Sequence, residues 1–252
     1  MFEYRYPRFQ SKRLLRAEML EELRDFPLSV LNGLWDASAQ GVVAGCSISW
    51  SAGVLTIGSG ILYANKQFYL MREPYKMPCE AVDKVRYLKV RFLPEETTPL
   101  ETIGATSIIL EERPTISGDE LELCRFRLQE GARLRDKHEN FEDCSTEFDT
   151  VDFTYAPWAG RKDSVLNPML IRRFAKELLD MRTGRAEDLS FSMAALAAGG
   201  RVDAEAVREY IRLRTGKVPA HGVRPAYEAL LAILKEGGGT DDGMSGESIL
   251  LI

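Results

Sequence analysis

The sequence predicts an α+β protein: N-terminal helices, then a small antiparallel β-sandwich or partly closed barrel, then a C-terminal helical domain. Three observations predict this class. Apolar residues recur at helical spacing near the start of the chain, alternate with small or polar residues between positions 41 and 128, and return to helical spacing after Pro168. Alternation with period two is typical of strands, whereas spacings of three and four residues are typical of helices.

The first residues of segment 1–40 predict an extended arm. Tyr4, Tyr6 and Phe9 occur there among basic residues without a clear period. Such an arm is either laid on a neighbouring surface or simply loose, as chain termini often are. We interpret its three aromatic residues as candidate contacts to a neighbour.

Two helices are expected after the arm. Ser11 stands where a helix N-cap belongs, and apolar residues follow it at helical spacing. We expect this helix to end near Phe26, because Pro27 disfavours helical geometry in the residue before it. A second helix is expected over residues 28–40. Its Trp35 predicts a core or subunit contact.

Residues 41–130 predict the antiparallel β-domain. Four short alternating runs occur within residues 41–71, and glycine or asparagine punctuates them, as in strands joined by tight turns. We expect these four strands to form one meander. Pro74 and Pro78 interrupt the pattern and predict a crossing loop.

Three further strands are expected beyond that loop, at residues 88–92, 105–111 and 124–128. Each alternates apolar with polar residues, which predicts one buried and one solvent-facing side. The basic residues of these strands, Lys89 among them, have acidic neighbours in the sequence. We therefore expect a solvated surface of mixed charge rather than an anion site.

The rest of the chain divides into three segments. Residues 131–166 form an irregular connector whose many aromatic residues are unusual for disordered sequence, so we expect it to be ordered against a neighbour, for example another copy of the chain. Residues 167–236 predict a domain of four short helices. Residues 237–252 predict a flexible tail with an apolar end.

Composition restricts the classes of partner. The net charge of −5 argues against nucleic acid, because binding to phosphate backbones depends on clustered Lys and Arg. No apolar run approaches the ~20 residues that span a bilayer, and the start lacks the apolar core of a signal peptide, which predicts no membrane insertion and synthesis in the cytoplasm. The four cysteines are widely spaced and predict reduced thiols.

The sequence offers no recognisable catalytic group. Its two histidines, His138 and His221, show no metal-ligand spacing and are expected on the surface or in loops. No nucleophile elbow or phosphate-binding loop occurs. Carboxylates such as Glu139, Glu142 and Asp143 are expected to be solvated. We therefore predict no catalytic, cofactor-binding or metal-ligating residues, and no enzymatic activity.

Two segments carry a family resemblance. The segment GVVAGCSISWSAGVLTIGSGILYANKQFYL, followed by RYLKVRF at residues 86–92, resembles a sequence common near the N-termini of phage tail-fibre and baseplate proteins. FDTVDFTYAPWAGRKDSVLNPMLIRRFAKELL is similar to proteins encoded in prophage-like regions of Gram-positive gut bacteria. Residues matching the first pattern are Gly41, Val42, Val43, Gly45, Gly53, Gly60 and Asn65.

The resemblance implies a structural component of a phage-like or contractile injection tail, in the baseplate or where a fibre attaches. Such a component acts through protein–protein interfaces with other tail or baseplate proteins and forms homo-oligomers, with a trimer favoured. It would be synthesised in the cytoplasm and then become part of a virion or injection particle. The interface residues expected here are Tyr4, Tyr6, Phe9, Trp35, Phe153, Tyr155 and Trp158.

An alternative from another class is a module that binds or cleaves carbohydrate. Trp50, Trp158 and the tyrosines would then act as stacking platforms for sugar rings. A nucleic-acid enzyme is a third hypothesis, which the acidic net charge disfavours.

Overall fold

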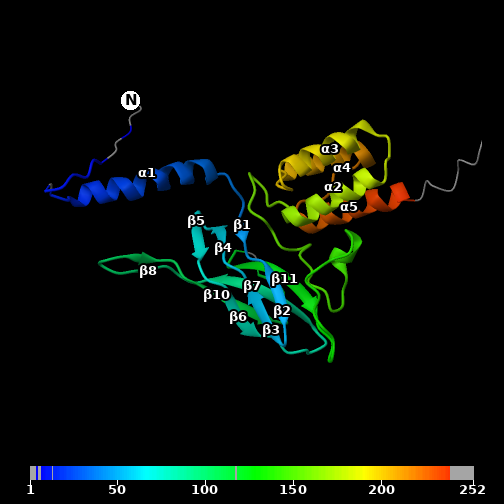
Figure 1. Ribbon diagram of the computed structural model, residues 1–252, viewed down its shortest axis with the longest axis horizontal. Helices are drawn as coiled ribbons and strands as arrows, with labels where there is room; N and C mark the ends of the chain where they lie inside the picture. Colours follow the sequence, from blue (N-terminus) through cyan, green and yellow to red (C-terminus); the bar gives the residue numbers. More distant parts are fainter. Residues whose placement is uncertain (1–3, 5–6, 13, 117, 239–252) are drawn as a thin grey trace, which may run out of the picture.

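The computed structural model describes residues 4, 7–12, 14–116 and 118–238. It confirms the predicted α+β class, with an N-terminal helix, antiparallel sheets that do not close into a barrel, and C-terminal helices (Figure 1). The helices of the described residues are α1 (Ala17–Trp35), α2 (Pro168–Asp180), α3 (Ala186–Ala197), α4 (Ala204–Thr215) and α5 (Val223–Gly238), with a short 3-10 helix at Glu142–Ser145.

The described strands pair antiparallel in three sheets and one small hairpin. The sheet orders are β1-β4-β5, β2-β3-β6 and β10-β7-β11, and β8 pairs with β9. The strands are β1 (Gly41–Gly45), β2 (Ile48–Ser51), β3 (Val54–Ile57), β4 (Gly60–Ala64), β5 (Gln67–Met71), β6 (Tyr75–Pro78), β7 (Val85–Phe92), β8 (Glu96–Thr97), β9 (Thr102–Ile103), β10 (Thr106–Glu111) and β11 (Glu120–Arg127).

The expected single meander is wrong, because the chain changes sheets between β3 and β4. Strands β2 and β3 form a hairpin in one sheet, whereas β4 and β5 form a hairpin in another. The crossing is tight at Gly45 and Gly60: a Cβ on Gly45 would overlap the Ser59 carbonyl oxygen, and one on Gly60 would overlap Cys46 Sγ. Only glycine fits where the two segments cross so closely.

The expected crossing loop at Pro74 and Pro78 is partly wrong as well. Tyr75–Pro78 forms strand β6, which pairs with β3 at the edge of its sheet. Proline cannot donate to a sheet ladder, but an edge strand needs to bond on one side only, so Pro78 is accommodated at the end of β6.

The two helices expected in residues 11–40 are a single helix, α1, which runs through Pro27. Ser11 lies in a turn, and α1 begins only after Arg16, which makes no side-chain cap bond. A proline inside a helix removes one backbone donor. The helix nevertheless continues, which shows that the apolar periodicity on both sides of Pro27 belongs to one element.

Two hydrophobic cores organise the remainder of the structure. One, the β core, lies between the sheets and includes Leu55, Leu88 and Cys124. The other, the helical core, lies among α2, α3, α4 and α5 and includes Phe174 and Tyr227. Three of the four cysteines are buried and none forms a disulfide.

The irregular connector joins these two cores. Its Val151 and Phe153 belong to the β core, whereas Phe141 and Leu166 belong to the helical core. The Tyr227 hydroxyl donates to the Phe141 carbonyl at 2.6 Å, which ties the connector to α5. For the described contacts, the neighbour that orders this segment is therefore the chain itself.

The C-terminal helices have well-defined ends. Asn167 caps α2 by accepting from the Met169 N–H at 2.9 Å, and Pro168 occupies the first turn. Gly216 ends α4 in the left-handed conformation, as expected for a glycine at that position. No helix in the described part of the chain is both long and apolar enough to cross a membrane.

Candidate interaction surface

Among the described helices, α1 is the one that the body of the protein covers least. None of its 19 residues is buried. Figure 1 shows it lying apart from the sheets and from the C-terminal helices. Its exposed large hydrophobic residues include Leu20, Leu23, Leu28, Val30, Leu31 and Leu34, and Leu14 and Leu15 are exposed just before it. A soluble protein rarely exposes so many adjacent apolar side chains without a partner.

The C-terminal end of α1 is attached to the body through Trp35. The Trp35 ring packs against Tyr63 of β4 and Phe68 of β5, with both centroid distances at 5.4 Å. The Tyr63 hydroxyl donates to the Trp35 carbonyl at 2.9 Å. Next to this contact, Lys66 pairs with Asp36 at 3.0 Å. This aromatic anchor holds one end of the helix, and apolar residues farther along it, such as Leu23 and Val30, remain exposed.

The arm precedes the free end of α1. Tyr4 is 71% exposed and Phe9 is 54% exposed, and Figure 1 shows that the chain before α1 turns near the start of the helix and runs back above it in this view. Tyr6 lies outside the described residues. The aromatic residues of the arm that the structure describes are therefore on the same projecting part of the molecule as α1.

The other three aromatic residues expected at an interface pack against other parts of their own chain. Phe153 is 8% exposed and packs in the β core. The Tyr155 ring lies between two guanidinium groups, with Arg125 at 3.3 Å and Arg224 at 4.7 Å from its centroid. Because Arg125 comes from β11 and Arg224 from α5, this stack joins the sheets to the helical core.

Trp158, the last of these residues, is partly buried against the β core. It bridges to Val42 and Val165, and Arg201 lies over its ring at 5.6 Å. Trp50 also packs against the β core. Sugar stacking requires an open aromatic face, so these positions lend the carbohydrate alternative no support.

A groove of about 880 Å³ opens between two strand edges. Its lining includes Phe68 and Leu70 of β5, Ile108 of β10, and Leu62 and Leu123. Among the described strands, β5 and β10 are edge strands of their sheets. Hairpin β8–β9 begins at this groove and projects from the sheets (Figure 1).

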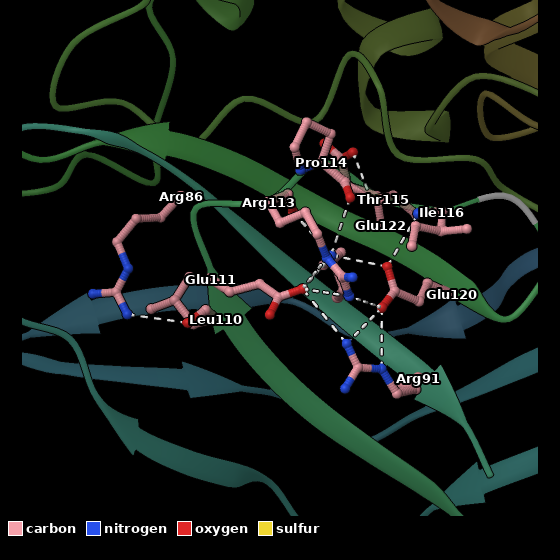
Figure 2. A network of polar contacts seen from close by, with 11 residues as sticks. Arg86, Arg91, Leu110, Glu111, Arg113, Pro114, Thr115, Ile116, Glu120 and Glu122 are labelled. Carbon is pink, nitrogen blue, oxygen red and sulfur yellow. Dashed lines mark hydrogen bonds and ion pairs between the residues drawn. The ribbon is translucent and has the colours of Figure 1, made fainter.

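A buried cluster of charges lies on the β10-β7-β11 sheet, contrary to the expected solvated surface. Lys89 is fully buried, and its Nζ contacts Glu111 at 2.7 Å and Glu120 at 2.8 Å. Figure 2 shows Arg91 and Arg113 converging on the same two carboxylates. Sequence alternation missed this, because the loop after β10 covers that face of the sheet: the Arg113 and Pro114 carbonyls also accept from Lys89.

The cluster holds Glu120 in its ionised form. Burial by itself raises the pKa of Glu120, but hydrogen bonds from Lys89, the Ile116 N–H and Arg91 outweigh it, and the pKa falls to about 2. A carboxylate with so low a pKa is a poor proton donor or acceptor near neutral pH. Since each acid faces opposite charges from its own chain, the cluster joins β7, β10 and β11.

The expectation of solvated acids is also wrong for Asp143. Arg135 contacts this carboxylate at 2.7 Å. Burial raises its pKa, yet the hydrogen bonds from Arg135, the Glu139 N–H and Thr146 prevail and lower the pKa to about 2. These contacts brace the turn that leads into the short 3-10 helix.

His138 is buried rather than on the surface, and its Nε2 lies 2.8 Å from the Val151 carbonyl. In the described residues, no three His, Cys, Asp or Glu side chains gather as a metal site would require.

Comparison with known proteins returned two solved structures of note. A crystal structure of TssK is similar over 93% of this chain and 69% of its own chain, at 9% identity and a TM-score of 0.43. A chain of the TssK-TssF-TssG baseplate subcomplex of the type VI secretion system is similar over 92% of this chain and all of its own length, at 10% identity and the same TM-score. At that TM-score the structural similarity is too weak to support a statement about the fold or the role of this chain. No family model and no curated protein matches the chain.

Proposed function

We propose that this chain is a structural component of a phage-like or contractile injection tail, a baseplate subunit or fibre-attachment connector, that acts by forming protein–protein interfaces. The observation that carries the proposal is α1, a 19-residue helix with no buried residue and an exposed apolar side. A helix of this kind supports a role in assembly, because its apolar side chains are covered only when another chain packs on them.

The composition of α1 supports the same conclusion. Isolated helices are marginal in water, and most helical stability in proteins comes from packing. Helix α1 contains Pro27 and Gly33, and Arg16 provides no side-chain cap. Burying one Leu or Val side chain contributes about 1.5–3 kcal/mol. A partner that covers four such residues would therefore offset the weaknesses of the helix.

The proposed partners are other tail or baseplate proteins together with further copies of this chain, a trimer being favoured. The resemblance at residues 41–70 and 86–92 supports the finer assignment to a tail. Tyr4, Tyr6 and Phe9 would extend the α1 surface, and Trp35 would anchor it. We place Phe153, Tyr155 and Trp158 in a supporting role, since they pack within the body of the chain to which Trp35 attaches α1.

Co-expression with the products of the genes adjoining its own tests the proposal. We expect those genes to encode sheath, tube or baseplate proteins, and the chain to co-elute with at least one of them. Substituting Val30→Glu places a charge on the apolar side of α1 and should abolish co-elution. Ser29→Glu adds the same charge one residue away, on the opposite side of the helix, and should leave co-elution intact.

Two results would contradict the proposal. The first is a gene neighbourhood without tail proteins, combined with no co-elution of the unmodified chain. The second is equal co-elution of the Val30→Glu and Ser29→Glu variants, because the proposal assigns assembly to the apolar side of α1.

A further inference from the structure

The apolar residues of α1 follow a spacing that identifies their partner more closely. Leu20, Leu23, Pro27, Val30 and Leu34 are separated alternately by three and four residues. This repeat places all five on one side of the helix, and it is the spacing by which helices pack against each other in coiled coils. These five residues are called the seam below. Each of them is exposed.

The residues beside the seam carry little charge. Coiled-coil pairing is selected by the side chains at these flanking positions, where like charges repel and opposite charges attract. Of those flanking the seam, only Arg24 is charged, and its Nε contacts Asp25 of its own chain at 2.6 Å. The flanking residues are Met19, Arg24, Phe26, Leu31 and Gly33.

The acidic residues of α1 lie away from the seam. Glu18, Glu21, Glu22 and Asp25 project from the other side of the helix. Two copies of α1 placed seam to seam would thus bring their apolar residues together with no like charges opposed. A partner helix with a strongly basic or acidic flank would find no complementary flank on α1. The charge pattern therefore favours a second copy.

The attachment of α1 leaves the seam accessible to such a copy. Its described aromatic contacts to the sheets are those of Trp35, at the C-terminal end, and Trp35 is not a seam residue. Figure 1 shows the rest of the helix lying clear of both cores. We propose that the α1 seam packs against the α1 seam of another copy of this chain. This inference rests on the proposed function, since it names the partner of the same helix.

Light scattering on the full chain after gel filtration tests the inference. We expect a mass of at least two copies of the 28.4 kDa chain, with α1 amides protected from hydrogen exchange. Val30→Glu should weaken self-association by at least about tenfold, which corresponds to 1.4 kcal/mol, and should expose the α1 amides. Ser29→Glu should change neither the mass nor the exchange.

Amide protection of α2 serves as the folding control, since Val30 and Ser29 are both exposed and neither variant should alter it. A monomer at every concentration overturns the inference, as does a Val30→Glu oligomer as stable as the unmodified one. A monomeric chain that still co-elutes with tail proteins through α1 would overturn the inference that two α1 seams pack together. The proposed function would then remain supported. Seam-dependent self-association without co-elution supports the inference and contradicts the tail assignment.

Discussion

Helix α1 and the four C-terminal helices carry similar sequence patterns but have opposite surroundings. In α2, α4 and α5 the apolar side is buried in the helical core, as at Leu170, Ile211 and Leu230. In α1 the corresponding residues, such as Leu23 and Leu34, are exposed. A side-chain cap does not separate the two groups, because α2 has one whereas α3 and α4 have none, like α1.

The difference teaches that amphipathic spacing predicts which side of a helix will be covered but not which molecule covers it. The C-terminal helices cover one another within a single chain. Helix α1 has the same requirement, and Trp35 attaches only its end to the sheets. Four predictions test this contrast between α1 and the body of the protein.

The largest expected effect comes from equal leucine truncations in the two kinds of helix. Leu170 is fully buried, so Leu170→Ala should lower the free energy of unfolding by about 4 kcal/mol. Leu23→Ala in α1 should change it by less than about 0.5 kcal/mol in dilute solution. Urea titration followed by near-UV circular dichroism measures both. Equal losses would mean that α1 packs on its own body.

Charged residues extend the comparison. Lys89→Met leaves the buried Glu120 and the half-buried Glu111 without their shared cation. It should lower the free energy of unfolding by about 3 kcal/mol, and not by more, because Arg91 and Arg113 remain in contact with Glu120. Arg24→Met removes an exposed partner of Asp25 on α1 and should leave the unfolding midpoint unchanged. Urea midpoints at neutral pH compare the two variants. A Lys89→Met protein more stable than the unmodified one would contradict the expectation.

Low pH should weaken the buried charge cluster more than the exposed ion pair of α1. The pKa of Glu120 is about 2 in the fold against an ordinary value of 4.5, so its contribution is present above pH 4.5 and is lost as pH falls toward 2. The loss should be on the order of 2 kcal/mol and should persist in high salt. The hydrogen bond from Arg24 also lowers the pKa of Asp25, but that pair is exposed and salt screens it.

Unfolding free energies measured from pH 7 to pH 2 check this prediction. The Glu120→Gln variant should lose less stability in acid than the unmodified chain. Some acid dependence should remain, because the pKa of Asp143 is lowered to about 2 as well. Parallel curves for the two proteins would show that Glu120 does not contribute.

The smallest effects concern the helix starts. Asn167→Ala removes the α2 cap and should cost about 1 kcal/mol. Arg16→Asn introduces a cap at α1 and should raise the helical signal in far-UV circular dichroism without changing the stability of the body. A stabilised body in the Arg16→Asn variant would indicate that α1 and the cores unfold together.

Sequence patterns predicted the helices and strands better than they predicted which parts of the chain pack over them. The strands around Val90 and Phe126 follow from the alternation of apolar and polar residues, and the structure contains both. Strand β6 was missed because Pro78 is compatible with an edge, and a single sequence does not reveal which strand lies at an edge. The burial of Lys89 was missed because the Arg113–Pro114 backbone approaches it only in the folded chain.

The candidate interface was partly visible in the sequence. The α1 apolar residues and the aromatic arm were predicted, and Trp35 was singled out as a contact. The continuity of α1 through Pro27 was not, because the bias against helix before proline is a preference that neighbouring helical residues overcame. Without that continuity the alternating spacing across Pro27 could not be seen as one seam.

By itself the sequence determined the fold class, the alternation of the strands and the apolar side of each helix, because these depend on local periodicity. Tertiary structure alone decided which of those sides the chain covers. The C-terminal helices are close enough along the chain to bury their apolar sides together, whereas Trp35 holds α1 at one end and none of the 19 residues of α1 is buried. Burial is a property of the assembled surfaces, so only the folded chain shows where one is left open.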